Sequence, residues 1–301
     1  MKKWEKALQR KIAKKYNSTY REMEKAFEKN SKKLAAQDAV MLSKLKGGKI
    51  SQDAYNEWRM KLENKLSKQV DGLAGQLGKA DAVAVNESNG VIATAYADGT
   101  NTELYEIEKI YRIQTSFKVV NEDAVSAATR GKFMRAIDKA KNTAYNKRRI
   151  RSAITSGILR GNSVKEVAKA LLPVVKGNKK SALRNAHEWL GGAYNCGTYE
   201  ESARLDASGV KMKKIWRAAN DNRVRQTHRD IDGEERDIND TFSNGGEYPL
   251  DPQLPAKEYY GCRCTFLTFP DGYAPVLKEH DYSDIDSDNY MDYEEWLENH
   301  E

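Results

Sequence analysis

Residues 216–233, WRAANDNRVRQTHRDIDG, and residues 261–264, GCRC, are the two stretches that decide the fold of the C-terminal part of the chain. They contain one histidine, His228, and a close cysteine pair, Cys262 and Cys264. Thiolates and imidazoles are the usual protein ligands of zinc, so this combination indicates a divalent metal site. The sequence supplies three ligands directly, whereas a structural zinc site normally takes four.

The fourth ligand is not decided by the sequence. We take Asp221 as the first candidate, and Asp230, Asp232 and Cys196 remain alternatives. The Cys-x-Cys spacing is tighter than the two-residue spacing usual in zinc sites. Two small buried cysteines beside a surface histidine would therefore also explain the pattern.

Short strands and turns are expected around these stretches. Residues 215–216 and 265–267 have the character of strands, and five of the six prolines lie beyond position 248. We therefore place a domain boundary near residue 209. A small α+β module over residues 209–275 is expected to follow it, and an acidic tail over residues 276–301.

The residues before this boundary have the periodicity of amphipathic helices. Apolar side chains recur at steps of three, four or seven over residues 4–34 and again over residues 55–77. A Gly-Gly pair at 47–48 separates the two patterns, and Ser51 is a typical N-cap for the second helix. The sequence therefore predicts a basic helical hairpin over residues 1–80.

The middle region, residues 81–208, is also expected to be helical. Residues 81–120 are ambiguous, because Asn-Gly and Asp-Gly pairs interrupt stretches rich in Ala and Val. Helical periodicity returns over about residues 121–160. This helix carries a basic cluster of Lys147, Arg148, Arg149 and Arg151. The predicted fold class is mostly α.

The charge is unevenly distributed along the 301 residues, whose formal net charge is +7. Residues 1–80 and residues 81–230 each carry +11, whereas residues 231–301 carry −15. Such asymmetry is typical of a chain whose ends meet partners of opposite charge. Ordinary solvated helix surfaces would also produce it.

Composition excludes several classes of protein. No apolar run reaches the roughly 18–20 residues that a membrane-spanning helix needs. The first five residues, MKKWE, lack the apolar core of a signal peptide. Three cysteines cannot form a disulfide framework. We therefore expect the chain to fold in a reducing, cytosolic compartment.

The order and spacing of the motif residues resemble those of the minor head, or head morphogenesis, proteins of tailed phages, the Mu F-like family. The resemblance covers about residues 125–270. It depends on Asp221-x-Arg223-Val224-Arg225-x-x-His228-x-x-x-Asp232-Gly233, on Cys262-Arg263-Cys264, and on the earlier Gly161-x-Ser163-x-x-Glu166-x-Ala168 and Lys214-x-Trp216. One departure is Tyr260-Gly261 before the first cysteine, where relatives often have Asn.

The resemblance implies a structural virion protein that is present in few copies in the head. It implies binding to the portal protein or the inner capsid during assembly, and a part in DNA packaging or ejection. Its location would be the interior of the virion head, after assembly in the host cytoplasm. It also implies that the conserved His and Cys bind metal, and we expect a structural zinc that stabilises the small module.

Basic residues are candidates for partner contacts. Packaged double-stranded DNA would be bound electrostatically and without sequence preference. Arg223 and Arg225 would share one face of a strand and contact phosphate or an acidic portal surface. Salt bridges to the nearby acids, Asp221 among them, are the alternative. The cluster Lys147, Arg148 and Arg149 is the other predicted contact.

The acidic tail nearly fits a twelve-residue calcium loop. Its acids stand at positions 1, 3, 5, 9 and 12, and Asn289 replaces the usual glycine. The predicted ligands are Asp284, Asp286, Asp288, Asp292 and Glu295. A solvated acidic tail that docks on a basic surface is the competing interpretation.

An enzyme is the alternative from another class. A His with Asp neighbours and a metal could hydrolyse phosphodiesters, as in a metal-dependent nuclease or a toxin-like enzyme. Two thiolates favour a closed structural site instead, and the sequence contains no phosphate-binding Gly-rich loop and no nucleophile elbow. We therefore predict no catalytic residues.

Overall fold

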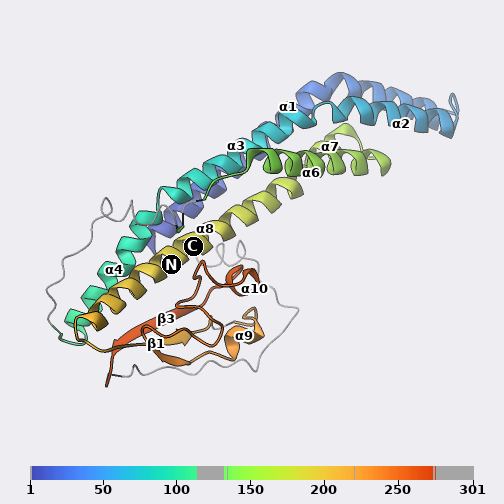
Figure 1. Cartoon of the computed structure of the whole chain (residues 1–301). Coiled ribbons are helices and arrows are strands. Elements are labelled where there is room, and N and C mark those ends of the chain that lie inside the picture. Colours follow the sequence, from blue (N-terminus) through green and yellow to red (C-terminus); the bar gives the residue numbers. More distant parts are fainter. Residues whose placement is uncertain (1, 114–131, 134, 220, 274, 276–301) are drawn as a thin grey trace. The chain divides into compact units, whose positions relative to one another are not determined.

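The computed structural model describes residues 2–113, 132–133, 135–219, 221–273 and 275 (Figure 1). The chain divides into two compact units. The first unit comprises Met1–Val91 and Met134–His187, and the second comprises Ile92–Phe133 and Glu188–Glu301. These limits differ from the predicted domain limits at 80, 208 and 275. The four predicted domains therefore stay a prediction.

The first unit is built from helices. They are α1 (Lys3–Lys46), α2 (Gln52–Ser67), α3 (Val70–Asn89), α6 (Lys139–Leu159), α7 (Val164–Lys169) and the beginning of α8 (Leu172–Ala207). Helix α1 packs against α2, α3 and α7, and α6 also packs against these three helices. The apolar stripes that the sequence predicts face this core, where the buried side chains include Ile12, Tyr16, Phe27, Leu62 and Leu66.

The second helix of the predicted hairpin is shorter than expected. The Ser51 hydroxyl accepts a hydrogen bond from the backbone N–H of Ala54 at 3.2 Å, which confirms the predicted cap. Helix α2 ends at Ser67, and α3 continues the same buried stripe from Val70 through Leu77. Because the apolar spacing continues across the break, the pattern alone does not reveal it.

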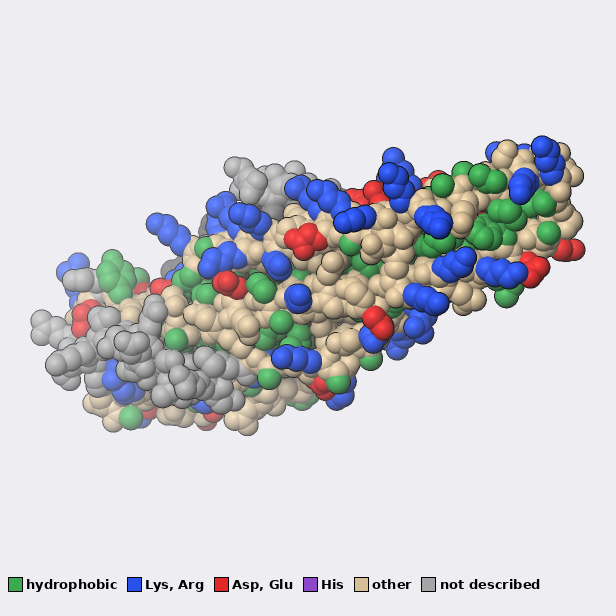
Figure 2. All heavy atoms as spheres, turned by 90° about the horizontal axis from the view of Figure 1, so that it is seen from above, with side chains coloured by type: hydrophobic (Ala, Val, Ile, Leu, Met, Phe, Trp, Pro, Cys, Tyr) green, Lys and Arg blue, Asp and Glu red, His purple; other side chains and the backbone are tan. Residues whose placement is uncertain are grey.

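The end of the hairpin lies beyond the buried core. Val40 is 55% exposed and Met60 is 67% exposed, and no residue from Ala39 to Ala54 is buried. Figure 2 shows hydrophobic side chains together with lysines and arginines at the surface of this arm. The ends of these long helices therefore expose both charged and hydrophobic side chains to solvent.

Of the ambiguous residues 81–120, residues 81–89 and 92–109 are helical. Helix α3 runs to Asn89, and α4 (Ile92–Lys109) follows it. The Asp-Gly pair at 98–99 lies inside α4 instead of in a turn. A Cβ at Gly99 would lie 2.1 Å from the carbonyl oxygen of Tyr194, and a Cβ at Gly197 would lie 2.2 Å from that of Tyr96. These glycines let α4 and α8 pack backbone to backbone.

The second unit adds a small antiparallel sheet to α4 and α8. The strands are β1 (Met212–Arg217), β2 (Glu235–Asp237) and β3 (Thr265–Pro270), in the order β2-β1-β3. Trp216 is opposite Phe266, and Lys214 is opposite Arg236. Two short helices, α9 (Gln226–Arg229) and α10 (Ala256–Tyr259), lie in the connections.

The predicted fold class is confirmed: the chain is mostly helical and carries a small α+β module towards its C-terminus. Both predicted strands form and pair with each other as β1 and β3. Among the helices in the described ranges, none is long and apolar enough to cross a membrane. The five predicted calcium ligands lie outside the described residues.

Candidate metal centre

The three sequence-predicted ligands meet in one buried cluster of the second unit. The Nδ1 atom of His228 lies 3.3 Å from Sγ of Cys264 and 3.7 Å from Sγ of Cys262. The three ligand atoms lie within 4.8 Å of one another. None of the three residues is more than 4% exposed. Soft donors this close, shielded from water, fit zinc or a similar thiophilic cation.

Local backbone structure positions the histidine. Helix α9 begins after Arg225, and the backbone N–H of His228 donates to the Arg225 carbonyl at 3.0 Å. The ring of Trp216 contacts the imidazole edge to face, with 5.1 Å between the ring centres. Because Trp216 is a buried residue of β1, the imidazole is held against the sheet.

The cysteines are held by the loop between α10 and β3. Gly261 has φ +74°, a conformation that favours glycine, and its N–H donates to Oε1 of Glu188 on α8 at 2.7 Å. The Arg225 guanidinium donates to the carbonyl of Tyr260. The loop is thus fixed to α8 and to the start of α9 immediately before Cys262.

Glu258 is a further candidate site residue that the sequence analysis missed. Its Oε2 lies 3.0 Å from Nε2 of His228, on the opposite side of the ring from the thiols, and the carboxylate is only 6% exposed. The Thr227 hydroxyl donates to the same oxygen at 2.9 Å. A carboxylate behind a metal-binding histidine fixes the orientation of the ring. No sequence motif predicts this contact, because the position of α10 in the fold brings Glu258 next to His228.

The two thiols differ in acidity. The Cys262 thiol donates a hydrogen bond that lowers the pKa of Cys264, burial opposes this shift, and His228 adds to the lowering. The same hydrogen bond and burial raise the pKa of Cys262. Without a bound cation, the imidazole and the two thiols therefore share protons through their hydrogen bonds. A bound cation would displace these protons.

The first candidate for the fourth ligand, Asp221, has other partners. The Arg263 guanidinium forms a two-pronged ion pair with its carboxylate, and the Arg223 backbone N–H donates to it at 2.9 Å. Burial would raise the pKa of Asp221, but these two donors hold it below its ordinary value. The described cluster of ligand residues contains His228, Cys262 and Cys264 only. Asp221 as a ligand stays a prediction.

The three alternative fourth ligands also lie in other environments. Asp232 accepts from the backbone N–H of Ala218 at 2.9 Å, and Asp230 accepts from Gln226. The thiol of Cys196 donates to Glu200 at 3.4 Å. Each group thus has a partner outside the cluster of His228, Cys262 and Cys264.

The predicted strand at Arg223 and Arg225 does not form. Residues 221–224 make a turn that Asp221 stabilises through the Arg223 N–H, and α9 follows directly. The two side chains therefore do not share a strand face. Arg223 lies 3.9 Å from Asp221, which agrees with the ion-pair interpretation, and Arg225 supports the cysteine loop.

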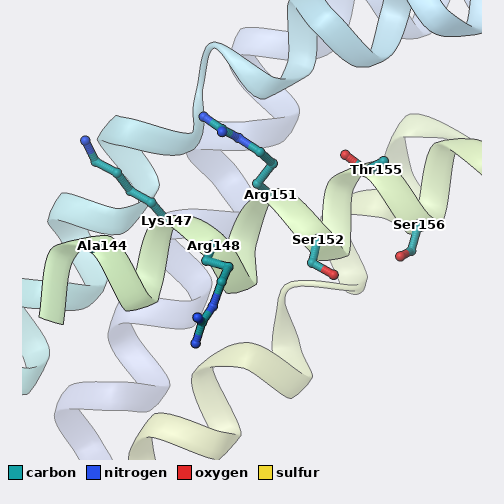
Figure 3. A pocket seen from close by; sticks show the side chains of 7 residues that line it. All are labelled: Ala144, Lys147, Arg148, Arg151, Ser152, Thr155 and Ser156. Atoms are coloured by element: carbon teal, nitrogen blue, oxygen red, sulfur yellow. The ribbon is translucent and has the colours of Figure 1, made fainter. Parts of the chain in front are cut away.

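The second predicted basic cluster lies on α6 of the first unit. Lys147 and Arg148 line a surface hollow together with Arg151 (Figure 3). Arg149 instead donates to Oδ1 of Asn178 at 2.8 Å. Adjacent basic residues on this helix therefore have different surroundings.

Comparison with known proteins finds one matching family and two similar proteins. Residues 148–267 match the family described as Phage Mu protein F like protein. The chain is 24% identical over 249 residues to Minor head protein GP7 of Bacillus phage SPP1, which covers 77% of this chain and 78% of that protein. No solved structure matches the chain.

The other relative carries an enzyme name. The chain is 30% identical over 203 residues to NAD(+)–arginine ADP-ribosyltransferase EFV of Enterococcus faecalis. The match covers 64% of this chain and 40% of the relative, so the chain spans well under half of that protein's length. Most of the relative lies outside the match.

Proposed function

We propose that this chain is a minor head protein that works by binding, because residues 148–267 match the family described as Phage Mu protein F like protein. The match to the minor head protein of phage SPP1 supports this role most directly, since it covers 78% of that protein. The matched family region includes the whole of α9 and the cysteine loop. The cluster of His228, Cys262 and Cys264 thus lies in the part of the chain that matches the family.

The proposed partners are the portal protein or the major capsid protein on the inner surface of the head. The basic helices would reach packaged double-stranded DNA, and the protein would assist packaging or ejection. The uneven charge supports this division, because residues 1–230 carry +22 and residues 231–301 carry −15.

A structural zinc is part of the proposal. His228, Cys262 and Cys264 would hold it, and Glu258 would orient the imidazole. Bound zinc supplies a cross-link between α9 and the loop before β3. This module has a small core of its own around Trp216 and Phe242, and a cross-link would add to its stability.

Assembly tests the proposed function. The full chain is co-expressed with the portal and major capsid proteins of its phage, and procapsids are purified by sedimentation. We expect the chain to sediment with procapsids and to co-purify with the portal protein. Procapsids that form without bound chain, together with no portal association, would overturn the proposal.

A metal-dependent nuclease or toxin-like enzyme is the second candidate, and the arginine ADP-ribosyltransferase relative motivates a test. The two hypotheses assign different roles to His228: a structural metal ligand in a binding protein, or a catalytic group in an enzyme. If His228→Ala loses both metal and the folded module, the site is structural. If the variant stays folded but loses a measurable nuclease or ADP-ribosyltransferase activity of the native chain, the enzyme reading replaces ours.

A further inference from the structure

One face of α6 in the first unit carries basic and hydroxyl side chains around a surface hollow. It is lined by Ala144, Lys147, Arg148, Arg151, Ser152, Thr155 and Ser156, which we call the α6 face. The spacing of three and four residues places them along a single side of the helix. In Figure 3, Arg148 and the two serines project on one side of this stripe, and Lys147, Arg151 and Thr155 on the other.

A second hollow adjoins the first. Arg148, Ser152 and Ser156 line both hollows. The second is also lined by Arg149 and Ala153 of α6 and by Ala170, Pro173 and Val174 around the start of α8. These three shared residues therefore form a ridge of one guanidinium and two hydroxyls with a depression on either side. Such a ridge offers donors along about two turns of helix.

The α6 face is positively charged and its arginines are available. No acidic residue lines either hollow. Arg148 lies 5.7 Å from the Tyr145 ring centre, and neither Arg148 nor Arg151 makes an ion pair or hydrogen bond with another described residue. Lys147 is partly neutralised by Asp71 at 3.0 Å.

One hydroxyl on the face is already used. Thr155 donates to Glu63 at 2.8 Å, so it supports the helix packing. Ser152 and Ser156 make no side-chain hydrogen bond within the described part of the chain. The guanidinium groups of Arg148 and Arg151 are therefore available to donate hydrogen bonds to a ligand. The hydroxyl groups of Ser152 and Ser156 can do the same.

We propose that the α6 face binds the phosphate backbone of double-stranded DNA, an inference that rests on the proposed head function. Guanidinium forks match phosphate oxygens, and serine hydroxyls donate to the same groups. Phosphate contacts carry no sequence information, so the proposed binding is independent of sequence. Arg151, Ser152 and Ser156 thereby join the predicted Arg148, whereas Arg149 serves the helix packing.

The test measures DNA affinity of the full chain against salt concentration. Duplexes of two unrelated sequences are titrated with the native chain and with Arg148→Gln/Arg151→Gln. We expect both duplexes to bind equally, and the slope of log affinity against log salt to fall by about 1.8, or 0.9 for each lost phosphate contact. Ser152→Ala/Ser156→Ala should weaken binding without changing the slope.

The matched control is Lys44→Gln/Lys46→Gln, which removes two exposed charges at the end of α1. Its slope should equal that of the native chain. If both double variants lose the same slope, binding is diffuse and the proposal is wrong. An unchanged slope in the α6 variant would also overturn it.

A competing occupant is the chain's own acidic segment, residues 276–301, which has one Lys against ten acids. A synthetic peptide of this segment is added to the native complex. If this peptide displaces DNA no better than a scrambled peptide of the same composition, the proposal is supported. If it displaces DNA much better than the scrambled peptide, and this difference depends on Arg148, the proposal is wrong. Incorporation of the α6 variant into procapsids separates this outcome from failure of the head function itself.

Discussion

Two buried polar clusters, one in each unit, differ in how their polar atoms are satisfied. In the first unit, the Asp81 carboxylate accepts hydrogen bonds from the Tyr16 hydroxyl at 2.6 Å and from the side-chain amides of Asn142, Asn146 and Asn178 at 2.8–3.2 Å. In the second unit, His228, Cys262 and Cys264 turn soft donor atoms towards one another. The first cluster is complete with its own residues, whereas the second would be completed by the proposed cation.

The two buried polar clusters have different roles in the fold. The Asp81 cluster joins α1, α3, α6 and α8 of the first unit through complementary donors and acceptors, so it specifies how the helices pack. Burial and the neighbouring Asp81 raise the pKa of Tyr16, which therefore stays a donor. The thiol cluster joins only α9 and one loop, and it has too few hydrogens to satisfy its own atoms once the thiols ionise.

The largest expected effect is the loss of a thiol ligand. Cys262→Ala should abolish stoichiometric metal binding and unfold the module around β1 and β3, because structural zinc contributes roughly 10 kcal/mol or more to small metal-dependent folds. Metal analysis and near-ultraviolet circular dichroism of Trp216 measure both changes. A folded, metal-loaded variant would show that the cluster does not need this ligand.

The next effect breaks the cluster in the first unit. Asp81→Ala leaves the Tyr16 hydroxyl and the amides of Asn142 and Asn146 without this acceptor, whereas the Asn178 amide keeps Oδ1 of Asn146. The free energy of unfolding should therefore fall by about 3 kcal/mol or more, at 1–3 kcal/mol for each of the three groups. Tyr16→Phe, which removes one hydrogen bond, is the matched control and should cost about 1 kcal/mol. Metal content should not change in either variant. Equal small losses would mean that the network is not a stabilising unit.

A third prediction concerns the buried carboxyl of Glu103 in the second unit. Burial raises its pKa to about 7, although hydrogen bonds from Ser202 and Thr268 oppose the shift. The folded state therefore binds a proton that the unfolded state has released between about pH 4.5 and pH 7, and stability should fall as pH rises through this window. Glu103→Gln should remove this component, worth about 3.4 kcal/mol at most, at 1.36 kcal/mol for each pKa unit. Chemical unfolding of both proteins at pH 5 and pH 8 measures the difference, and parallel pH profiles would contradict the assignment.

The smallest effect separates a ligand from a residue that orients one. Glu258→Gln should lower zinc affinity by roughly 10- to 100-fold while the module stays folded with excess zinc. Asp221→Asn, which loses an ion pair with Arg263 instead, should leave the affinity unchanged. If Asp221→Asn lowers zinc affinity more than Glu258→Gln does, the fourth-ligand prediction from the sequence holds and our reading of Glu258 is wrong.

The sequence predicts the helices, strands β1 and β3 and the three residues of the candidate metal site, because each depends on local periodicity or residue type. Ser51, for example, forms the predicted N-cap of α2. Gly99 resembles a turn residue locally, yet its lack of a side chain serves the contact with α8. Glu258 and Asp81 acquire their roles from residues far away in the chain, and no spacing rule encodes such contacts.

Zinc content under chelation tests the central claim most directly. The native full chain is purified without added metal, and native mass spectrometry counts bound zinc while circular dichroism follows the module during titration with a chelator. We predict one zinc for each chain, released together with the folded signal of Trp216. A chain that contains no metal, or that keeps the folded signal after all metal is removed, would contradict the account.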